Sequence, residues 1–195
     1  SMPNYPEKGD KDAANAILDK AGYKKDANGV RMKAVLDIIP YGEDWRRAGE
    51  YLKQAMGDIG IALELRYEDV PTWLKRVYHN YDFEMNVNYF YQLPDPVLGV
   101  HRHYGTDQIR KGTHFVNSSR YSNPTLDALL DSGAGEPDAG KRTAKYKEIQ
   151  QILAEDMPVV NLFELEFLVV YNTKLKGVYD SAMGAYGSFR EGYLD

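Results

Sequence analysis

Aromatic and polar side chains gather where Tyr89-Phe90-Tyr91-Gln92 is followed by Leu93-Pro94-Asp95-Pro96, in a chain that holds 16 Tyr and 2 Trp. Tyrosine and tryptophan rings stack on planar or ring-shaped solutes, and hydroxyl and amide groups both donate and accept hydrogen bonds. If the run ends a strand, Phe90 points to the face opposite Tyr89 and Tyr91. The run therefore predicts an aromatic wall of a solute site.

Histidines offer a second chemistry. His101 and His103 stand two residues apart, and on a strand they would present two imidazoles to a metal, with His79 or His114 as a third ligand. This reading gives an alternative function, a metal-dependent hydrolase that uses His101 and His103. The competing interpretation is ordinary polar packing, or contact between His103 and a ligand.

Sequence signatures of catalysis are missing from the chain. There is no Gly-x-Ser-x-Gly nucleophile elbow, no phosphate-binding loop that ends in Gly-Lys-Ser/Thr, and no His-Glu-x-x-His. Cysteine is absent, which excludes disulfides, thiolate metal sites and a cysteine nucleophile. We therefore expect neither an enzyme nor a bound cofactor or metal.

Charge and hydropathy exclude further classes of partner. The 195 residues carry a formal net charge of -5, and Lys and Arg are scattered, which argues against nucleic acid and against an anionic membrane surface. No stretch approaches the roughly 18 apolar residues of a membrane span. Ser1-Met2 is expected to be a cloning remnant that precedes an internal sequence, because no signal-peptide pattern follows it.

The elements that must position these residues follow from periodicity. A strand-like run at 32–38, an amphipathic helix at 45–59 and an alternating run at 61–67 form a crossover unit, whose two strands should be parallel neighbours. Alternation predicts a third strand near 83–89, which ends at the aromatic run. The fold class is therefore α/β, with a mixed, mostly parallel sheet flanked by helices.

Further helices are expected at 10–21, 72–80, 124–133 and 139–156. Residues 159–171 are apolar and β-branched enough to predict one or two more strands. Periodicity is lost after Lys174, and the Gly- and Tyr-rich end is expected to be irregular, or to need an absent partner to become ordered.

Taken in order, several motifs resemble the family 5 extracellular solute-binding proteins, which deliver peptides, nickel chelates, opines and some sugars to ABC importers. The motifs are Ala16-Ile17-Leu18-Asp19-Lys20-Ala21-Gly22-Tyr23, Ile59-Gly60-Ile61, Pro94-Asp95-Pro96, Tyr121-Ser122-Asn123-Pro124-Thr125-Leu126-Asp127 with Leu129-Leu130, Arg142, Tyr146 through Pro158, and Lys176-Gly177. The resemblance runs over most of the chain.

The resemblance implies a periplasmic-binding-protein-like lobe. Residues 3–175 would form the C-terminal lobe of a two-lobed protein, and residues 176–195 would return to a missing N-terminal lobe. It implies that the parent protein lies in the periplasm or on the outer cell surface and hands a peptide-like or other polar solute to a membrane permease. A module that senses a solute and signals to a membrane receptor is a further hypothesis.

Site residues are also implied by the resemblance. In peptide-binding relatives, an aspartate that holds the α-amino group of the ligand corresponds to Gln92, and the aromatic residue nearby corresponds to Tyr89. The arginine that grips the ligand carboxylate in dipeptide binders corresponds to Ile39. Both ionic contacts are therefore expected to be missing. The expected ligand-facing set is Tyr89, Tyr91, Gln92, Trp73, Tyr41, Ile39 and His103.

Overall fold

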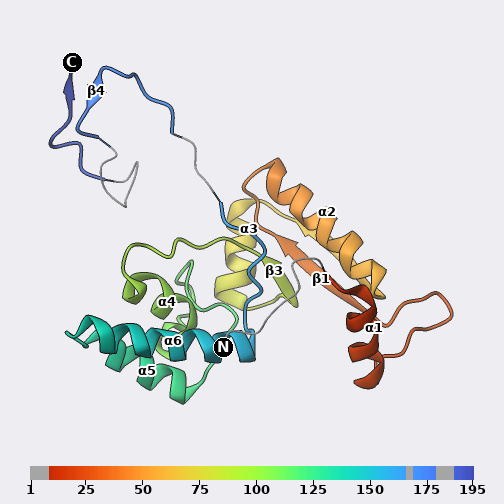
Figure 1. Ribbon diagram of the computed structural model, residues 1–195. Helices are drawn as coiled ribbons and strands as arrows, with labels where there is room; N and C mark the ends of the chain where they lie inside the picture. The colour runs from red at the N-terminus through yellow and green to blue at the C-terminus, as the bar shows by residue number, and fades with distance from the viewer. Residues whose placement is uncertain (1–8, 166–168, 179–186) are drawn as a thin grey trace.

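The computed structural model describes residues 9–165, 169–178 and 187–195 (Figure 1). The α-helices are α1 (Lys11–Lys20), α2 (Glu43–Asp58), α3 (Val70–Leu74), α4 (Pro96–Tyr104), α5 (Pro124–Ala134) and α6 (Ala139–Asp156). The strands are β1 (Met32–Ile38), β2 (Ile61–Tyr67), β3 (Met85–Val87), β4 (Leu175–Lys176) and β5 (Tyr193–Leu194). A π-helix, η1 (Lys75–Asn80), continues α3, and η2 (Thr106–Gln108) is a 3-10 turn. None of the described helices is long and apolar enough to span a bilayer.

A three-stranded sheet in the order β2-β1-β3 organises the first half of the chain. β1 pairs in parallel with β2 from Met32 opposite Ile61 to Ile38 opposite Tyr67, and β3 pairs in parallel with the end of β1. The predicted crossover unit, and with it the α/β class, is confirmed. Within the described residues this sheet is purely parallel, and the antiparallel pair β4–β5 forms a separate sheet.

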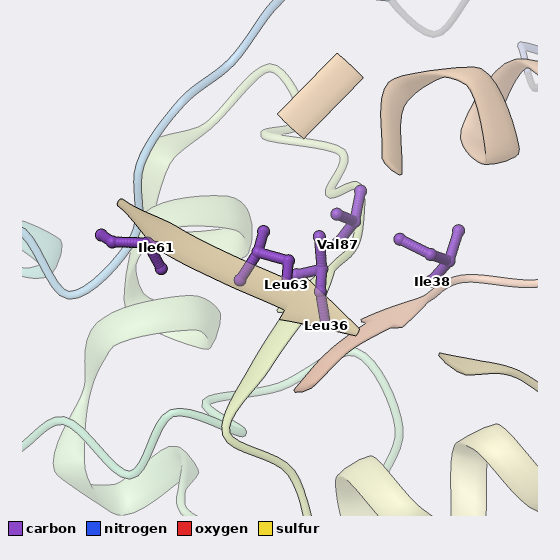
Figure 2. Close-up of a cluster of buried hydrophobic side chains, with 5 residues drawn as sticks. All are labelled: Leu36, Ile38, Ile61, Leu63 and Val87. Carbon is purple, nitrogen blue, oxygen red and sulfur yellow. The ribbon is translucent and has the colours of Figure 1, made fainter. Parts of the chain in front are cut away.

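Helix α2 covers one face of the sheet (Figure 1). Leu36, Ile38, Ile61, Leu63 and Val87 point into this interface (Figure 2), and the apolar stripe of α2 packs on them. Gly49 lets the helix approach closely, because a Cβ at this position would lie 2.6 Å from Ile38 Cδ1. At the start of α2, Gly42 adopts φ 109°, a conformation that favours glycine and turns the chain from β1 into the helix.

Helices α4, α5 and α6 form a second packing group. Leu126, Leu130 and Ile149 are fully buried between them, with Tyr104 beside them. The predicted start of α5 at its Asn123 cap is confirmed, since Asn123 Oδ1 accepts from the Thr125 and Leu126 amides. Helix α4 was not predicted from the sequence, although Asp95 caps its N-terminus and Pro96 occupies its first position, which is a recognised start signal.

The sequence predicted one helix at 72–80, and the structure divides this segment. α3 ends at Leu74 and a π-helix continues to Asn80, where Tyr81 ends it in the left-handed region at φ 52°. Trp73, Val77 and Tyr78 are fully buried and form a second core cluster with Ile39 and Val116.

Asp37 in the middle strand is fully buried and carries a carboxylate into this region. Arg66 on β2 donates to both of its oxygens, at 2.6 and 2.7 Å. Arg76 of η1 lies 3.8 Å from the same carboxylate and donates to Glu68 at 2.6 Å, which holds the pKa of Glu68 below its ordinary value. Asp82 completes this ion-pair network through Arg76. The network joins β1, β2 and η1.

Two expectations for the second half of the chain need correction. Described residues 159–165 and 169–171 form no strand and pair with neither sheet of the described chain. Apolar side chains such as Val160 and Val170 are exposed there. The end of the chain, predicted to be irregular, contains the short β4–β5 pair, which Figure 1 shows away from the main sheet. Residues 179–186 lie outside the described residues.

We predict that Arg66→Met lowers the free energy of unfolding by about 3 kcal/mol, because it leaves the buried Asp37 carboxylate with a more distant partner, Arg76. Urea denaturation monitored by circular dichroism measures the change. Arg46→Met is the control, because the Arg46 guanidinium lies over the partly exposed Tyr67 ring. This substitution should lower the free energy of unfolding by about 1 kcal/mol or less. Equal losses in the two variants would contradict this assignment.

Stability should also depend on the protonation of His103. Burial, with a smaller contribution from Arg102, lowers the pKa of His103 to about 3, against about 6.5 in an unfolded chain. The neutral ring therefore stabilises the fold above pH 6.5, and this contribution is lost as pH falls toward 3. We expect a loss of about 2 kcal/mol between pH 7.5 and pH 5. His103→Leu should flatten this part of the denaturation profile, and an unchanged slope would contradict it.

Candidate functional site

The carboxyl ends of β1 and β3 lie side by side, because Ile38 pairs with Val87 in the parallel ladder. One further backbone hydrogen bond, from Ile39 N to Val87 O at 3.2 Å, extends the pairing. The chain leaves β1 toward α2 and leaves β3 toward α4. Residues that follow the two strands therefore meet at one edge of the sheet, the position at which open α/β sheets bind ligands.

Five aromatic side chains, which we call the aromatic cluster, meet at this edge: Tyr41, Trp45, Tyr89, Tyr91 and Phe163. Tyr89 lies at the centre, with its ring centroid 5.8 Å from Tyr41, 5.5 Å from Trp45 and 5.7 Å from Tyr91. Phe163 extends the cluster through Trp45 at 6.2 Å. These spacings are those of interacting aromatic pairs, and the rings are tilted or edge-on to one another.

The cluster is open to solvent on one side. Tyr41, Tyr91 and Phe163 are 40, 36 and 55% exposed, whereas Trp45 and Tyr89 are partly buried beneath them. Exposed ring faces bind apolar faces of solutes by stacking, and the tyrosine hydroxyls add hydrogen-bonding groups at the rim. Chemically, the arrangement can bind and orient a polar molecule that has a flat or ring-shaped face.

A buried tyrosine supports the central ring from below. Asn88 Nδ2 donates to the Tyr78 hydroxyl oxygen at 2.7 Å, and Asn88 Oδ1 accepts from the Tyr89 backbone N–H at 2.8 Å. Tyr78 is fully buried, and burial raises its pKa to about 12, so its hydroxyl stays protonated. Because β3 ends at Val87, these side-chain contacts fix the backbone just beyond the strand.

Four of the residues expected to face a ligand are placed at or beside this edge. Tyr41, Tyr89 and Tyr91 belong to the aromatic cluster, and Gln92 follows it as an exposed residue. The backbone of Gln92 packs on α4 at Gly99, where a Cβ would lie 2.0 Å from the Gln92 carbonyl oxygen. These four residues remain candidates for ligand contact.

The structure corrects the other three expectations. Trp73 and Ile39 are 0 and 1% exposed and belong to the core around Val77 and Tyr78, so neither side chain can touch a solute in this arrangement. His103 is 3% exposed, and its ring packs against Phe90 with centroids 3.8 Å apart. These residues are buried because their apolar surfaces fill space beneath the edge, so they support the site from within.

The geometry does not support the alternative of a metal pair at His101 and His103. His101 and His103 lie on helix α4 rather than on a strand, and residues two apart on a helix do not face one another. His101 Nε2 lies 3.2 Å from Asp107 Oδ1, whereas His103 is buried. In the part of the chain that the structure describes, no three His, Cys, Asp or Glu side chains are grouped to hold a metal.

Sequence reasoning missed two members of the aromatic cluster. Trp45 was assigned to the apolar stripe of the helix at 45–59, and Phe163 to a predicted strand. Trp45 could have been found, because the first turn of a helix that directly follows a parallel strand lies at the ligand-binding edge. Phe163 carries no such signal, since it lies 118 residues after Trp45 (163 minus 45) and only the folded chain brings them together.

Family comparison gives an independent result. Residues 1–110 match the model described as bacterial extracellular solute-binding proteins, family 5 Middle. Di/tripeptide-binding protein 1 of Pseudomonas aeruginosa (strain UCBPP-PA14) is 25% identical over 174 residues, which are 89% of this chain and 31% of that protein. The chain thus spans about a third of the length of this curated relative.

Solved structures share the fold. HbpA2 from Haemophilus parasuis aligns over 100% of this chain and 38% of its own, with a TM-score of 0.74 and 19% identity. A periplasmic oligopeptide-binding protein from Thermotoga maritima, solved with bound mannohexaose, aligns over 80% of this chain and 31% of its own, with a TM-score of 0.65 and 25% identity. The parallel sheet and its covering helices therefore have the architecture of periplasmic binding proteins.

We predict that Tyr78→Phe destabilises the chain by about 1 to 2 kcal/mol, because it removes the hydroxyl partner of the partly buried Asn88 amide. Thermal or urea denaturation measures the difference. Tyr51→Phe removes a hydroxyl from a side chain that is 70% exposed and should leave stability unchanged. A Tyr78→Phe protein as stable as the parent chain would show that this hydrogen bond does not hold the end of β3.

Proposed function

The chain belongs to the family 5 bacterial extracellular solute-binding proteins, and we propose from this premise that it is one ligand-facing lobe of a solute-capturing subunit of an ABC importer. The parent protein would close two lobes around its solute by a hinge motion and present it to a membrane permease. This proposal places the parent in the periplasm or on the outer cell surface. It assigns binding and no catalysis to this chain.

The aromatic cluster carries this proposal. Its exposed rings lie at the carboxyl edge of a parallel sheet, where ligands of open α/β folds bind. A second lobe placed over Tyr41 and Tyr91 would turn an open wall into an enclosed site. The length comparison supports a missing lobe, because about two-thirds of the curated relative has no counterpart in this chain.

A neutral, hydroxyl-rich or conjugated solute fits the edge better than a free peptide. Gln92 stands where peptide-binding relatives are expected to carry an aspartate, and the apolar Ile39 stands where dipeptide binders are expected to carry an arginine. A glutamine amide and tyrosine hydroxyls pair with hydroxyl and amide groups without leaving a charge unpaired. The similar periplasmic oligopeptide-binding protein from Thermotoga maritima was solved with mannohexaose bound, which supports this proposal.

Mass spectrometry of the full-length parent, purified under native conditions, tests the proposed function by identifying a co-purified solute. Tyr89→Ala and Trp45→Ala should each weaken rebinding of that solute, because they remove the central stacking surfaces. Stacking on one aromatic side chain contributes about 1 to 3 kcal/mol to the binding free energy. Tyr23→Ala is the control, since Tyr23 is exposed and lies before β1.

The isolated 195-residue chain should bind the same solute far more weakly than the parent, because half a site buries too little of it. Undiminished affinity of the Tyr89→Ala and Trp45→Ala parents, or equal affinity of chain and parent, would contradict the proposed site.

We predict that the parent does not select a free α-amino terminus. A ligand whose ammonium group is buried without a carboxylate partner loses about 3 to 5 kcal/mol of binding free energy, which is about two to three orders of magnitude in affinity. Calorimetry with matched free and acetylated peptides should show no preference for the free amine, and Gln92→Asp should introduce one. If the unmutated parent binds the free amine about tenfold more tightly, another carboxylate supplies the missing contact.

A further inference from the structure

Two exposed histidines, His79 and His114, lie together on the surface although they are 35 positions apart in the sequence (114 minus 79). Their ring centroids are 5.5 Å apart, and the ring planes meet at 54°. His79 belongs to the π-helix η1, and His114 follows the turn at Gly112. No hydrogen bond or ion pair joins either imidazole to another residue in the part of the chain that the structure describes.

Both histidines are connected to the same buried residue, Tyr78. The Gly112 N–H donates to the Tyr78 carbonyl oxygen at 2.8 Å, which ties the turn to η1. The Tyr78 ring, fully buried, also lies 5.7 Å from the His114 ring. Tyr78 directly precedes His79 in η1. The two histidines therefore lie on segments that Tyr78 joins to each other.

The turn at Gly112, which leads to His114, packs on the face of the His79 ring. A Cβ built on Gly112 would lie 3.2 Å from His79 Cε1, 3.4 Å from Nδ1 and 3.7 Å from Nε2, which places it over the ring face. Gly112 has φ 86°, where glycine is favoured, and a side chain there would crowd the ring. Glycine at this position therefore lets the turn pack closely on the His79 ring.

We propose that His79 and His114 together bind one divalent transition-metal ion such as Zn²⁺ or Ni²⁺, with water in the remaining positions. Imidazole nitrogens bind zinc at about 2.0 to 2.1 Å, which puts the centroids of two rings on one tetrahedral ion about 5 to 5.5 Å apart. The observed 5.5 Å matches this spacing. Neutral imidazole suits these borderline ions, and it does not suit Mg²⁺ or Ca²⁺.

This site is separate from the pair that the sequence suggested. The sequence offers His79 or His114 as a third ligand for His101 and His103, but the fold brings His79 and His114 to each other. Neither belongs to the aromatic cluster, so the metal site does not depend on the proposed solute site. Two protein ligands leave several coordination positions open, which makes the bound ion exchangeable.

Isothermal titration of the 195-residue chain with NiCl₂, and separately with ZnCl₂, tests the proposal. We expect one equivalent of metal, and we expect His79→Ala and His114→Ala each to weaken binding by at least about tenfold, since even outer-shell partners of metal ligands change affinity by about 10- to 100-fold. His101→Ala is the matched control, because it removes an imidazole that lies beside Asp107 and leaves the proposed pair intact. Circular dichroism checks that each variant is folded.

Electron paramagnetic resonance with one equivalent of Cu²⁺ gives a readout that stability does not affect. Two coordinated imidazole nitrogens are expected in the unmutated chain and one in each single variant. The proposal is wrong if both single variants bind Ni²⁺ and Zn²⁺ as the unmutated chain does, or if affinity is lost in His101→Ala instead. A Cu²⁺ spectrum with a single imidazole nitrogen in the unmutated chain would equally overturn it.

Discussion

The buried carboxylate of Asp37 is the constraint around which the sheet side of this chain is arranged. A charge in the middle strand of a parallel sheet is costly unless it is paired, and Arg66 supplies a two-pronged partner from β2 while Arg76 approaches from η1. The favourable contact with Asp37 raises the pKa of Arg66 above its ordinary value, so the guanidinium stays charged. Neutralising one buried charge thus fixes the register of two strands and anchors the helix that follows them.

The same network reaches the candidate site through a short series of contacts. Arg76 anchors η1, and η1 carries Val77 and Tyr78 into the core beneath the sheet edge. The Tyr78 hydroxyl binds Asn88, and Asn88 binds the backbone of Tyr89, the central ring of the aromatic cluster. A solute site assembled from loop residues needs such support, because side chains beyond the end of a strand have no ladder of hydrogen bonds to hold them. The core contributes to the proposed site by fixing the positions of the rings in the aromatic cluster. Trp73 and Ile39 have this role and make no direct contact with a solute.

Exposed apolar residues divide into two kinds on this chain. The rings of Tyr41 and Tyr91 are exposed, and both contact the Tyr89 ring that lies between them. Such a group of fixed, exposed rings is suited to binding a ligand. Apart from Phe163, residues 160–165 and 169–171 are exposed outside that cluster and form no strand, although their composition favours one. Strand propensity is realised only where a partner supplies hydrogen bonds, so composition alone overestimated the strands in this segment.

Periodicity determined the framework of this protein directly from the sequence. The strands at 32–38 and 61–67 and the helix at 139–156 have the predicted bounds, because the alternation of apolar residues is a local property that burial on one face imposes. The edge at which Tyr89 and Tyr91 lie also followed from the order of strand and loop.

Tertiary structure alone decided which aromatic rings meet there and which histidines are neighbours. Trp45 meets Phe163, and His79 meets His114, across long separations in the chain, and Trp73 and His103 are buried by the packing of other elements. Local sequence fixes the face on which a residue lies in its own element, but burial and pairing depend on what other segments bring to that face.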